Sequence, residues 1–330
     1  DLHLCDRRQR QMCIRDRNKS MIKNLFCFLI CIWQCLHVPA QFPETDFQLS
    51  VENPFFSDKK WGGAADPVMV WNEHYKEWFV YYTQRRAYYD GQGVEWMHGS
   101  SIGIASSKDG KEWKYRGTCV GDENLTNKKH TQTWWAPEVI VQDGLMHMFV
   151  TFVPGVYQDW NAKRFIKHFT SKEGMRWKYQ STLSLSTEHC IDAGVCKVRD
   201  KWLLWYKDEA NDNHTWFAES TDLYHWDVVG PAITDCGHEA PFVWEYDNKY
   251  WMIVDAWDKG LRIYSSENGR DTWTYSSTII GSHPAIYLIN GKFIFLCHGS
   301  AGKARLNSDR ETALYIGELL YEKGRFIHSN

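Results

Sequence analysis

Residues 102–113 read IGIASSKDGKEW, a run of strand-forming residues followed by a Ser-rich turn and a closing tryptophan, Trp113. The same pattern returns as FTSKEGMRW up to Trp177, AESTDLYHW up to Trp226 and YSSENGRDTW up to Trp273. These tryptophans are 64, 49 and 47 residues apart. Because a repeat of roughly 40–50 residues is typical of propeller blades, the pattern predicts an array of similar structural units.

The segments between these repeats have the composition of β-strands. Short runs such as EWFVYYTQ, LMHMFVTFV and KWLLWYKDE are rich in aromatic and β-branched residues, and Asp-Gly or Asn-Gly turns separate them. No helical stripe of 12 or more residues interrupts them. We therefore predict an all-β, five-bladed β-propeller with about four antiparallel strands per blade between about residues 47 and 326, the repeated tryptophans packing between adjacent blades.

The composition narrows the class of ligand. The chain has 330 residues, of which 43% are hydrophobic and 24% charged, and its formal net charge is −3, which excludes a disordered chain. The same near-neutral balance argues against a nucleic-acid partner, which would require a basic face. The chain also contains 18 Trp, 17 Tyr and 16 Phe, more ring surface than a core needs. Part of that surface is expected to line a site for a small neutral ligand.

The first forty residues have a different character. From Met21 the chain reads MIKNLFCFLICIWQCLHVPAQ, with an early lysine, an apolar run at 25–33 and small residues near position 40. This pattern predicts a signal peptide at 21–40, since the run is too short to span a membrane. We expect 1–20 to be a non-native segment, 41–330 to be a single catalytic domain, and the mature protein to be secreted or periplasmic and free of the membrane. The five cysteines after residue 40 are an odd number and lack zinc-binding spacing.

Three acidic residues stand at the start of three different units. They are Asp66 in WGGAADPVMVW, Asp192 in HCIDAGVCKV and Glu239 in CGHEAPFVWEY. Each is flanked by small residues or proline and is followed by an apolar strand. The innermost strands of a propeller direct their first residues at the central axis. Equivalent positions in separate blades would therefore bring the three carboxylates into one pocket.

These motifs resemble those of the family 43 glycoside hydrolases and their five-bladed relatives. The matching segments, which cover nearly the whole mature chain, are Ala65-Asp66-Pro67, Trp135-Ala136-Pro137-Glu138, Ile191-Asp192 and Glu239-Ala240-Pro241. The resemblance implies an inverting hydrolase in which Asp66 is the general base, Glu239 the general acid and Asp192 the carboxylate that raises the pKa of the acid. Ala193 and Ala240 depart from the proline and glycine that are usual in relatives.

The implied substrate is a plant or algal polysaccharide or oligosaccharide, with arabinofuranosides and xylosides expected first. Two other interpretations stay open. One is a retaining fructosidase-like hydrolase, although its Asn-Asp-Pro-Asn and Arg-Asp-Pro motifs are missing. The other is a propeller that binds carbohydrate without catalysis. The insertions at 88–99, 122–133 and 154–163 are expected to form the rim that decides specificity.

Further residues are candidates for contact with the sugar or with a metal. One of Trp61, Trp134 and Trp135 is expected to stack on a sugar ring. Glu138 either faces the pocket or braces its blade, and His238 either contacts sugar hydroxyls or bonds to the backbone. The resemblance adds Arg310, from a last-blade arginine that reaches substrate, and His283, from a histidine beside calcium or water in the central channel. No cofactor is expected to be required, and Ca²⁺ is the candidate metal. The oligomeric state is left open.

Overall fold

Strands dominate the computed structural model, which describes residues 42, 45–50, 52–121, 131–300 and 310–329. These residues belong to one unit, Phe42–Asn330. The segments predicted as non-native (1–20) and as a signal peptide (21–40) lie outside the described residues, as does most of the insertion at 122–133. Within the described ranges, no helix has the length and apolar character needed to cross a membrane.

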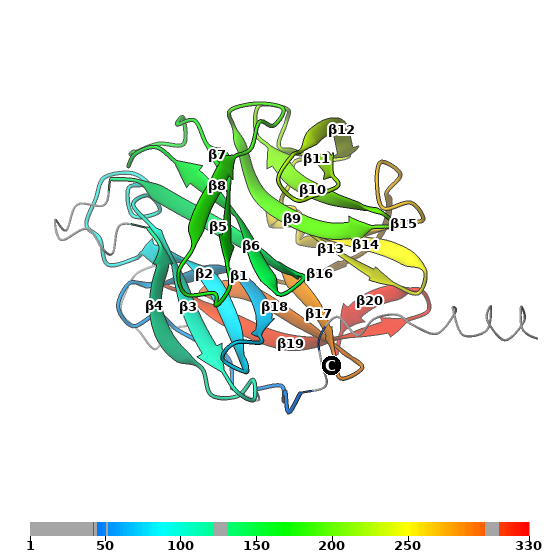
Figure 1. Cartoon of the computed structure of the whole chain (residues 1–330), viewed down its shortest axis with the longest axis horizontal. Helices are drawn as coiled ribbons and strands as arrows, with labels where there is room; N and C mark the ends of the chain where they lie inside the picture. Colours follow the sequence, from blue (N-terminus) through cyan, green and yellow to red (C-terminus); the bar gives the residue numbers. More distant parts are fainter. Residues whose placement is uncertain (1–41, 43–44, 51, 122–130, 301–309, 330) are drawn as a thin grey trace, which may run out of the picture. The chain divides into compact units, whose positions relative to one another are not determined.

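Twenty strands and one short 3₁₀ helix form the regular structure of the described residues (Figure 1). In chain order they are β1 (Gly62–Asn72), β2 (Glu77–Arg86), β3 (Ser101–Ser107), β4 (Lys114–Val120), β5 (Thr133–Gln142), β6 (Leu145–Val153), β7 (Phe165–Ser171), β8 (Lys178–Thr182), β9 (Cys190–Val198), β10 (Lys201–Asp208), β11 (His214–Ser220), β12 (Asp227–Ile233), β13 (Glu239–Tyr246), β14 (Lys249–Asp255), η1 (Trp257–Lys259), β15 (Leu261–Ser266), β16 (Thr274–Ile279), β17 (Ala285–Ile289), β18 (Lys292–Ser300), β19 (Thr312–Glu322) and β20 (Arg325–His328).

Consecutive strands pair antiparallel in five groups of four, which are β1–β4, β5–β8, β9–β12, β13–β16 and β17–β20. The first strand of each group contacts the first strand of the next, and β17 contacts β1. The five first strands therefore form a closed ring, with the other strands of each group outside it. The predicted all-β, five-bladed propeller is confirmed.

The first and last blades are joined by hydrogen bonds. The N–H of Phe55 donates to the carbonyl of Leu314 at 3.0 Å, and the N–H of Leu314 donates to the carbonyl of Phe56 at 2.9 Å. The side-chain amide of Asn53 donates to the carbonyl of Ile316 at 2.8 Å. The segment before β1 thus runs beside β19 of the last blade. Because this pairing satisfies backbone groups at the seam, it closes the ring without a covalent link.

The repeated tryptophans connect neighbouring blades, as predicted from the sequence. Each indole nitrogen donates to a carbonyl in its own turn, three residues earlier in the chain. Three of the rings pack on an aromatic side chain from the second strand of the preceding blade: Trp177 on Tyr81 at 5.7 Å, Trp226 on Phe149 at 5.6 Å and Trp273 on Trp205 at 6.3 Å. In the first blade, Trp113 packs on Phe55 of the seam at 5.1 Å.

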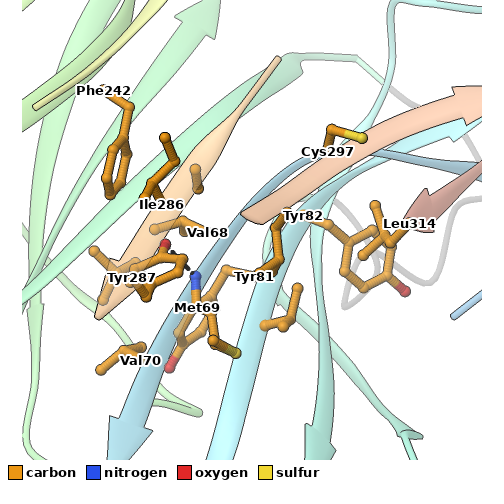
Figure 2. Close-up of a cluster of buried hydrophobic side chains, with 14 of the residues drawn as sticks. Val68, Met69, Val70, Tyr81, Tyr82, Phe242, Ile286, Tyr287, Cys297 and Leu314 are labelled. Carbon is orange, nitrogen blue, oxygen red and sulfur yellow. Dashed lines mark hydrogen bonds between the residues drawn. The ribbon is translucent and has the colours of Figure 1, made fainter. Parts of the chain in front are cut away.

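The core between the first and last blades is shown in Figure 2. Met69 of β1 packs there with Ile286 and Tyr287 of β17, all of them buried. The hydroxyl of Tyr287 accepts the Met69 N–H at 2.7 Å, which satisfies two polar groups inside the apolar cluster. The two blades that close the ring therefore share one continuous core.

Each blade has one residue in the left-handed backbone region at the start of its first strand. These residues are Asp66 (φ 53°), Ala136 (φ 45°), Asp192 (φ 58°), Ala240 (φ 55°) and His283 (φ 51°). Register shifts accompany them in the first four blades. Such a bulge re-aims the side chains around it. Asp66 and Asp192 are thus equivalent, but Glu239 is not, because Ala240 holds the equivalent position and Glu239 precedes it by one residue.

Candidate active site

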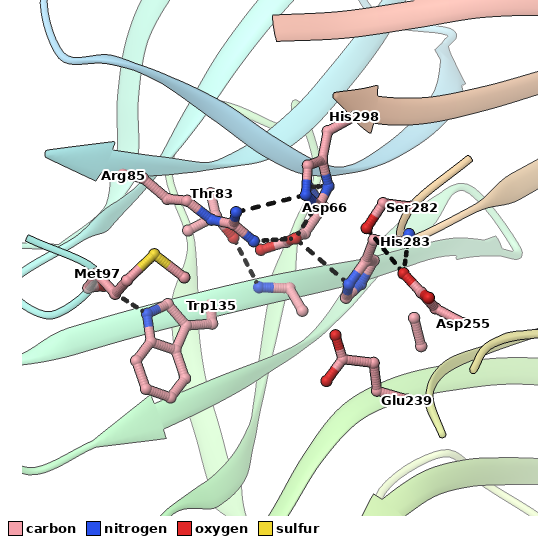
Figure 3. A network of polar contacts seen from close by, with 12 residues as sticks. Asp66, Thr83, Arg85, Met97, Trp135, Glu239, Asp255, Ser282, His283 and His298 are labelled. Atoms are coloured by element: carbon pink, nitrogen blue, oxygen red, sulfur yellow. Dashed lines mark hydrogen bonds and ion pairs between the residues drawn. The ribbon is translucent and has the colours of Figure 1, made fainter. Parts of the chain in front are cut away.

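All three predicted carboxylates line one cavity of about 430 Å³. Asp66 comes from the first blade, Asp192 from the third and Glu239 from the fourth. Figure 3 shows the side chains of Asp66, His283 and Glu239 directed toward the same space. A volume of this size lies at the lower end of the range for small-ligand sites.

Asp66 is buried and held by cationic and imidazole groups (Figure 3). Its Oδ1 lies 2.9 Å from a terminal nitrogen of Arg85, 3.3 Å from Nδ1 of His283 and 3.4 Å from Nδ1 of His298. Burial alone would raise the pKa of Asp66, but the charges of Arg85 and His283 outweigh it and hold the pKa well below its ordinary value. Asp66 is therefore a carboxylate over the whole neutral range.

The two histidines beside Asp66 differ in charge. Burial lowers the pKa of His298 to about 3, with Arg85 acting in the same direction, and its Nδ1 accepts the Asp66 N–H at 3.2 Å. His298 is therefore neutral. For His283, burial lowers the pKa, but Asp66, Asp192 and Glu239 outweigh burial and raise it. His283 can thus donate from Nδ1 to Asp66, while its backbone N–H donates to Asp255 Oδ2 at 3.0 Å.

Asp192 is the buried carboxyl at the third-blade position. Its backbone N–H donates to Thr151 Oγ1 at 3.1 Å, and its Oδ2 accepts the backbone N–H of Ala240 at 3.2 Å. Burial raises its pKa to about 7; His283 opposes the rise and the negative charge of Glu239 reinforces it.

Glu239 takes part in a chain of charged groups along one wall of the cavity. Its Oε2 lies 3.0 Å from Nζ of Lys207, which lies 3.3 Å from Glu209 Oε1. Glu209 Oε2 in turn lies 3.0 Å from Nε of Arg164. Glu239 is thus held by an ammonium group that is itself shared with a second carboxylate.

Several of these residues were not identified from the sequence: Arg85, Arg164, Lys207, Glu209, Asp255 and His298. Lys207 and Arg85 stand at the inner ends of second strands, where KWLLWYKDE and EWFVYYTQRR change from apolar to charged. The change from a run of apolar residues to a charged residue could have identified these two positions. The contact of Lys207 with Glu239 depends on the packing of the third blade against the fourth, and no spacing along the chain reveals it.

Of the three tryptophans proposed for stacking, Trp135 lines the cavity, and its Nε1 donates to the Met97 carbonyl at 2.8 Å. Trp61 and Trp134 do not line it. Trp134 is buried in the core against Phe152 at 4.7 Å, because successive strand residues face opposite sides of the sheet. Trp61 precedes β1, and its backbone N–H donates to Asp58 Oδ1 at 3.0 Å.

Glu138, His238 and Arg310 also lie outside the lining of this cavity. His238 is a structural histidine, because its Nε2 contacts Thr215 Oγ1 at 2.5 Å and its Nδ1 contacts the Cys236 carbonyl at 2.8 Å. Arg310 donates to the Tyr89 carbonyl at 3.1 Å in an exposed contact. None of these three residues lines the candidate cavity, and their contact with a substrate stays a prediction.

Glu138 faces a second, smaller cavity of about 20 Å³, which Asp66, Asp192 and His283 also line. Its Oε1 accepts the Val195 N–H at 3.4 Å, and burial raises its pKa to about 8. This second cavity is about the size of a single water. Glu138 is thus an inner-channel carboxyl that is neutral at pH 7, and it bonds across to the third blade.

The fit of calcium at His283 can be tested against its neighbours. Calcium takes six to eight oxygen ligands, and the carboxylate beside Nδ1 of His283 is Asp66, already paired with Arg85. Among the residues that the structure describes, no group of three or more His, Cys, Asp or Glu side chains could hold a metal ion. These residues do not fit a directly coordinated calcium ion, and the mechanism below uses none.

No family model and no curated protein matches the chain. Similar solved structures include a family-43 β-xylosidase/α-arabinofuranosidase from a compost microbial metagenome, in complex with xylotriose, with a TM-score of 0.65, 16% identity, and coverage of 86% of this chain and 98% of that one. A family-43 β-1,3-galactosidase has a TM-score of 0.62 and 15% identity, with 81% and 93% of the chains covered. A family-32 β-fructofuranosidase from Bombyx mori has a TM-score of 0.62 and 14% identity, with 84% and 66% covered.

The chain therefore has the propeller fold of the family-43 glycoside hydrolases, as the motifs indicated. The family-32 structure shares that fold as well. At identities below 20%, the likeness concerns the fold, and what the protein does has to be argued from the cavity and its charged groups.

Proposed function

We propose that the protein is a glycoside hydrolase that cleaves O-glycosidic bonds in the 430 Å³ cavity. The observation that carries the proposal is that Asp66, Asp192 and Glu239, which lie far apart along the chain, line that one cavity. Hydrolysis of a glycoside needs one carboxyl that donates a proton and one that accepts a proton. The coincidence of three acids at inner-strand starts with an aromatic wall supports this chemistry over a purely structural role.

In the proposed reaction, Asp66 accepts a proton from a water molecule while the water oxygen forms a bond to the anomeric carbon. The bond from that carbon to the leaving oxygen breaks, and Glu239 donates its proton to the leaving oxygen. The products are a sugar with inverted anomeric configuration and a free alcohol. In its ionised form, Asp192 acts on Glu239 through its charge, because a negative neighbour favours the protonated form of the acid. Inversion rests on the resemblance of the motifs.

The proposed substrate is a plant or algal polysaccharide or an oligosaccharide derived from it, cleaved at an arabinofuranose or xylose unit. Trp135 and Trp160, with ring centroids 6.0 Å apart and planes tilted by 55°, supply an apolar wall against which the C–H face of a sugar can pack. We extend the proposal to secretion, on the basis of the apolar run at 25–33 and the small residues that follow it.

A second candidate is a propeller that binds carbohydrate without cleaving it. The ion pairs favour this alternative, since Asp66 is held by Arg85 and Glu239 by Lys207. A carboxylate whose pKa lies far below the ordinary value is a weak base, and a carboxyl beside an ammonium is favoured in its ionised form, which has no proton to donate. Catalysis requires that substrate binding loosen at least one of these pairs.

The deciding experiment measures sugar release from a panel of polysaccharides and aryl glycosides, with the product anomer read by proton NMR in the first minutes. We expect wild-type turnover with inversion, and a loss of about 100-fold or more in Glu239→Gln and Asp66→Asn. Binding of the same oligosaccharides, followed by calorimetry, serves as the control. Binding without turnover in the wild type would establish the second candidate instead.

A further inference from the structure

Trp257 presents an unusually exposed indole at the cavity. It is the first residue of η1, directly beyond β14, and its side chain lines the cavity while 47% of the residue is exposed. Its backbone has a φ of 54°, in the left-handed region. A bulky residue rarely adopts that conformation, which costs about 1–3 kcal/mol. A tryptophan that is both exposed and strained in the wall of a cavity indicates that its ring has a function there.

Neighbouring groups hold Trp257 in place. Its backbone N–H donates to Asp255 Oδ1 at 2.9 Å, which fixes the main chain, and Nζ of Lys207 lies 5.1 Å from the centroid of the ring. In the loop before β13, a Cβ added to Gly237 would lie 3.2 Å from the indole, so the absence of a side chain at Gly237 leaves room for the ring. The ring is therefore preorganised before a ligand arrives.

The same residues connect Trp257 to the reacting groups. Asp255 Oδ2 accepts the His283 N–H at 3.0 Å, and His283 contacts Asp66. Asp255 is also the strand partner of Glu239. Lys207 lies between the indole and the carboxyl of Glu239, at 3.0 Å from the latter. The Trp257 ring thus lies beside Glu239, on a different blade from Trp135 and Trp160.

We propose that Trp257 is the platform on which the sugar of the leaving group packs, opposite the wall formed by Trp135 and Trp160. This inference rests on the proposed function, because Glu239 marks the leaving-group side only if it protonates the leaving oxygen. The C–H face of a sugar ring buries apolar area against an indole, and a ring already fixed in position loses little entropy on binding. Trp257 would therefore determine specificity for the leaving sugar.

The test compares substrates with and without a sugar as the leaving group. The probes are β-1,4-xylobiose with β-D-xylosyl fluoride, and arabinobiose with α-L-arabinofuranosyl fluoride, and the pair that the wild type cleaves is used. For Trp257→Ala we expect kcat/KM to fall about tenfold or more on the disaccharide, mainly through KM, and much less on the fluoride. Trp257→Phe, which keeps a ring, should recover part of the loss.

Tyr275→Ala is the matched control, because Tyr275 is 49% exposed on β16 of the same blade and does not line the cavity. It should leave both rates unchanged. Equal losses on disaccharide and fluoride in Trp257→Ala, or no loss on either, would overturn the proposal. If the wild type cleaves neither pair, the proposed function fails, and calorimetry with xylobiose and arabinobiose decides about the ring: unchanged affinity in Trp257→Ala rejects the platform, and weakened affinity retains it as a binding surface.

Discussion

Nζ of Lys207 lies 3.0 Å from Oε2 of Glu239, and the lysine side chain is only 6% exposed. Water therefore screens this pair poorly, so its charges act strongly on each other. Burial lowers the pKa of Lys207, but Glu239, Asp192 and Glu209 outweigh burial and raise it. The lysine remains charged at any pH at which the protein would work, and the proposed acid always has a cation beside it.

Replacing that cation should impair hydrolysis. In Lys207→Met we expect kcat/KM to fall about tenfold or more, because the hydrogen bond from the ammonium that holds Glu239 Oε2 in the cavity wall is lost. Lys201→Met is the control on the same strand, since Lys201 pairs with Glu219 and does not line the cavity. An unchanged kcat/KM in Lys207→Met would show that this contact does not position Glu239 for the reaction.

Arg85 should govern how kcat/KM for hydrolysis changes on the acid side of its pH profile. With the arginine present, the pKa of Asp66 lies well below its ordinary value, so no loss of activity from Asp66 is expected above pH 4. In Arg85→Met the pKa of Asp66 should rise, and kcat/KM should fall as the pH drops below about 6. Arg85→Lys keeps the charge and should resemble the wild type more closely.

The same variant affects stability in a predictable direction. A depressed carboxyl pKa stabilises the folded protein above the ordinary pKa, and this contribution is lost as the pH falls. Arg85→Met should therefore be destabilised at pH 7, by about 3–5 kcal/mol if the buried carboxylate finds no new partner, and less at pH 3.5. Urea unfolding at the two pH values measures the difference, and equal destabilisation at both would contradict it.

Asp192 should show opposite effects on stability and activity. Burial raises its pKa to about 7, so the folded protein holds a proton there that the unfolded chain loses above about pH 4. That contribution to stability decreases as the pH rises from 4 to 7. Asp192→Asn should therefore be more stable than the wild type at pH 8 and yet hydrolyse at least tenfold more slowly. Loss of activity with no gain in stability at pH 8 would contradict the raised pKa.

Glu138 should behave as a structural carboxyl with its own pH window. Its pKa is raised to about 8 by burial, from an ordinary value of 4.5, so the stability of the folded protein decreases as the pH rises between these values, by up to about 1.4 kcal/mol per pH unit. Glu138→Gln should gain stability over the wild type at pH 8 relative to pH 5. Glu112→Gln, at an exposed position, should show the same difference at both pH values.

The sequence was sufficient for the fold because each blade repeats its own local pattern. The turn that ends at Trp177 shows a serine, a glycine and an indole at set spacings, and these make contacts within a few residues. The carboxylates Asp66 and Asp192 could be found for the same reason, since each starts an inner strand. Trp134 and Trp135 could not be separated, because the face to which each points depends on the exact register of β5.

The residues that pair with the carboxylates could not be predicted from the sequence. Arg85 meets Asp66 across one hairpin, but Lys207 and Glu239 are brought together only by the packing of the third blade against the fourth. The spacing of residues 207 and 239 along the chain does not predict that contact. The same holds for His298, which reaches Asp66 across the seam between the first and last blades.

The left-handed backbone conformation at the start of each first strand does not depend on which side chain stands there. Ala136 and Ala240 adopt the same strained backbone as Asp66, Asp192 and His283, although a methyl group gains nothing from it. Aspartate tolerates that conformation better than alanine, so Ala136→Asp would fit the existing main chain. The axis therefore has five backbone positions of the same conformation, one in each blade. Substituting their side chains could alter the reaction while the propeller backbone stays the same.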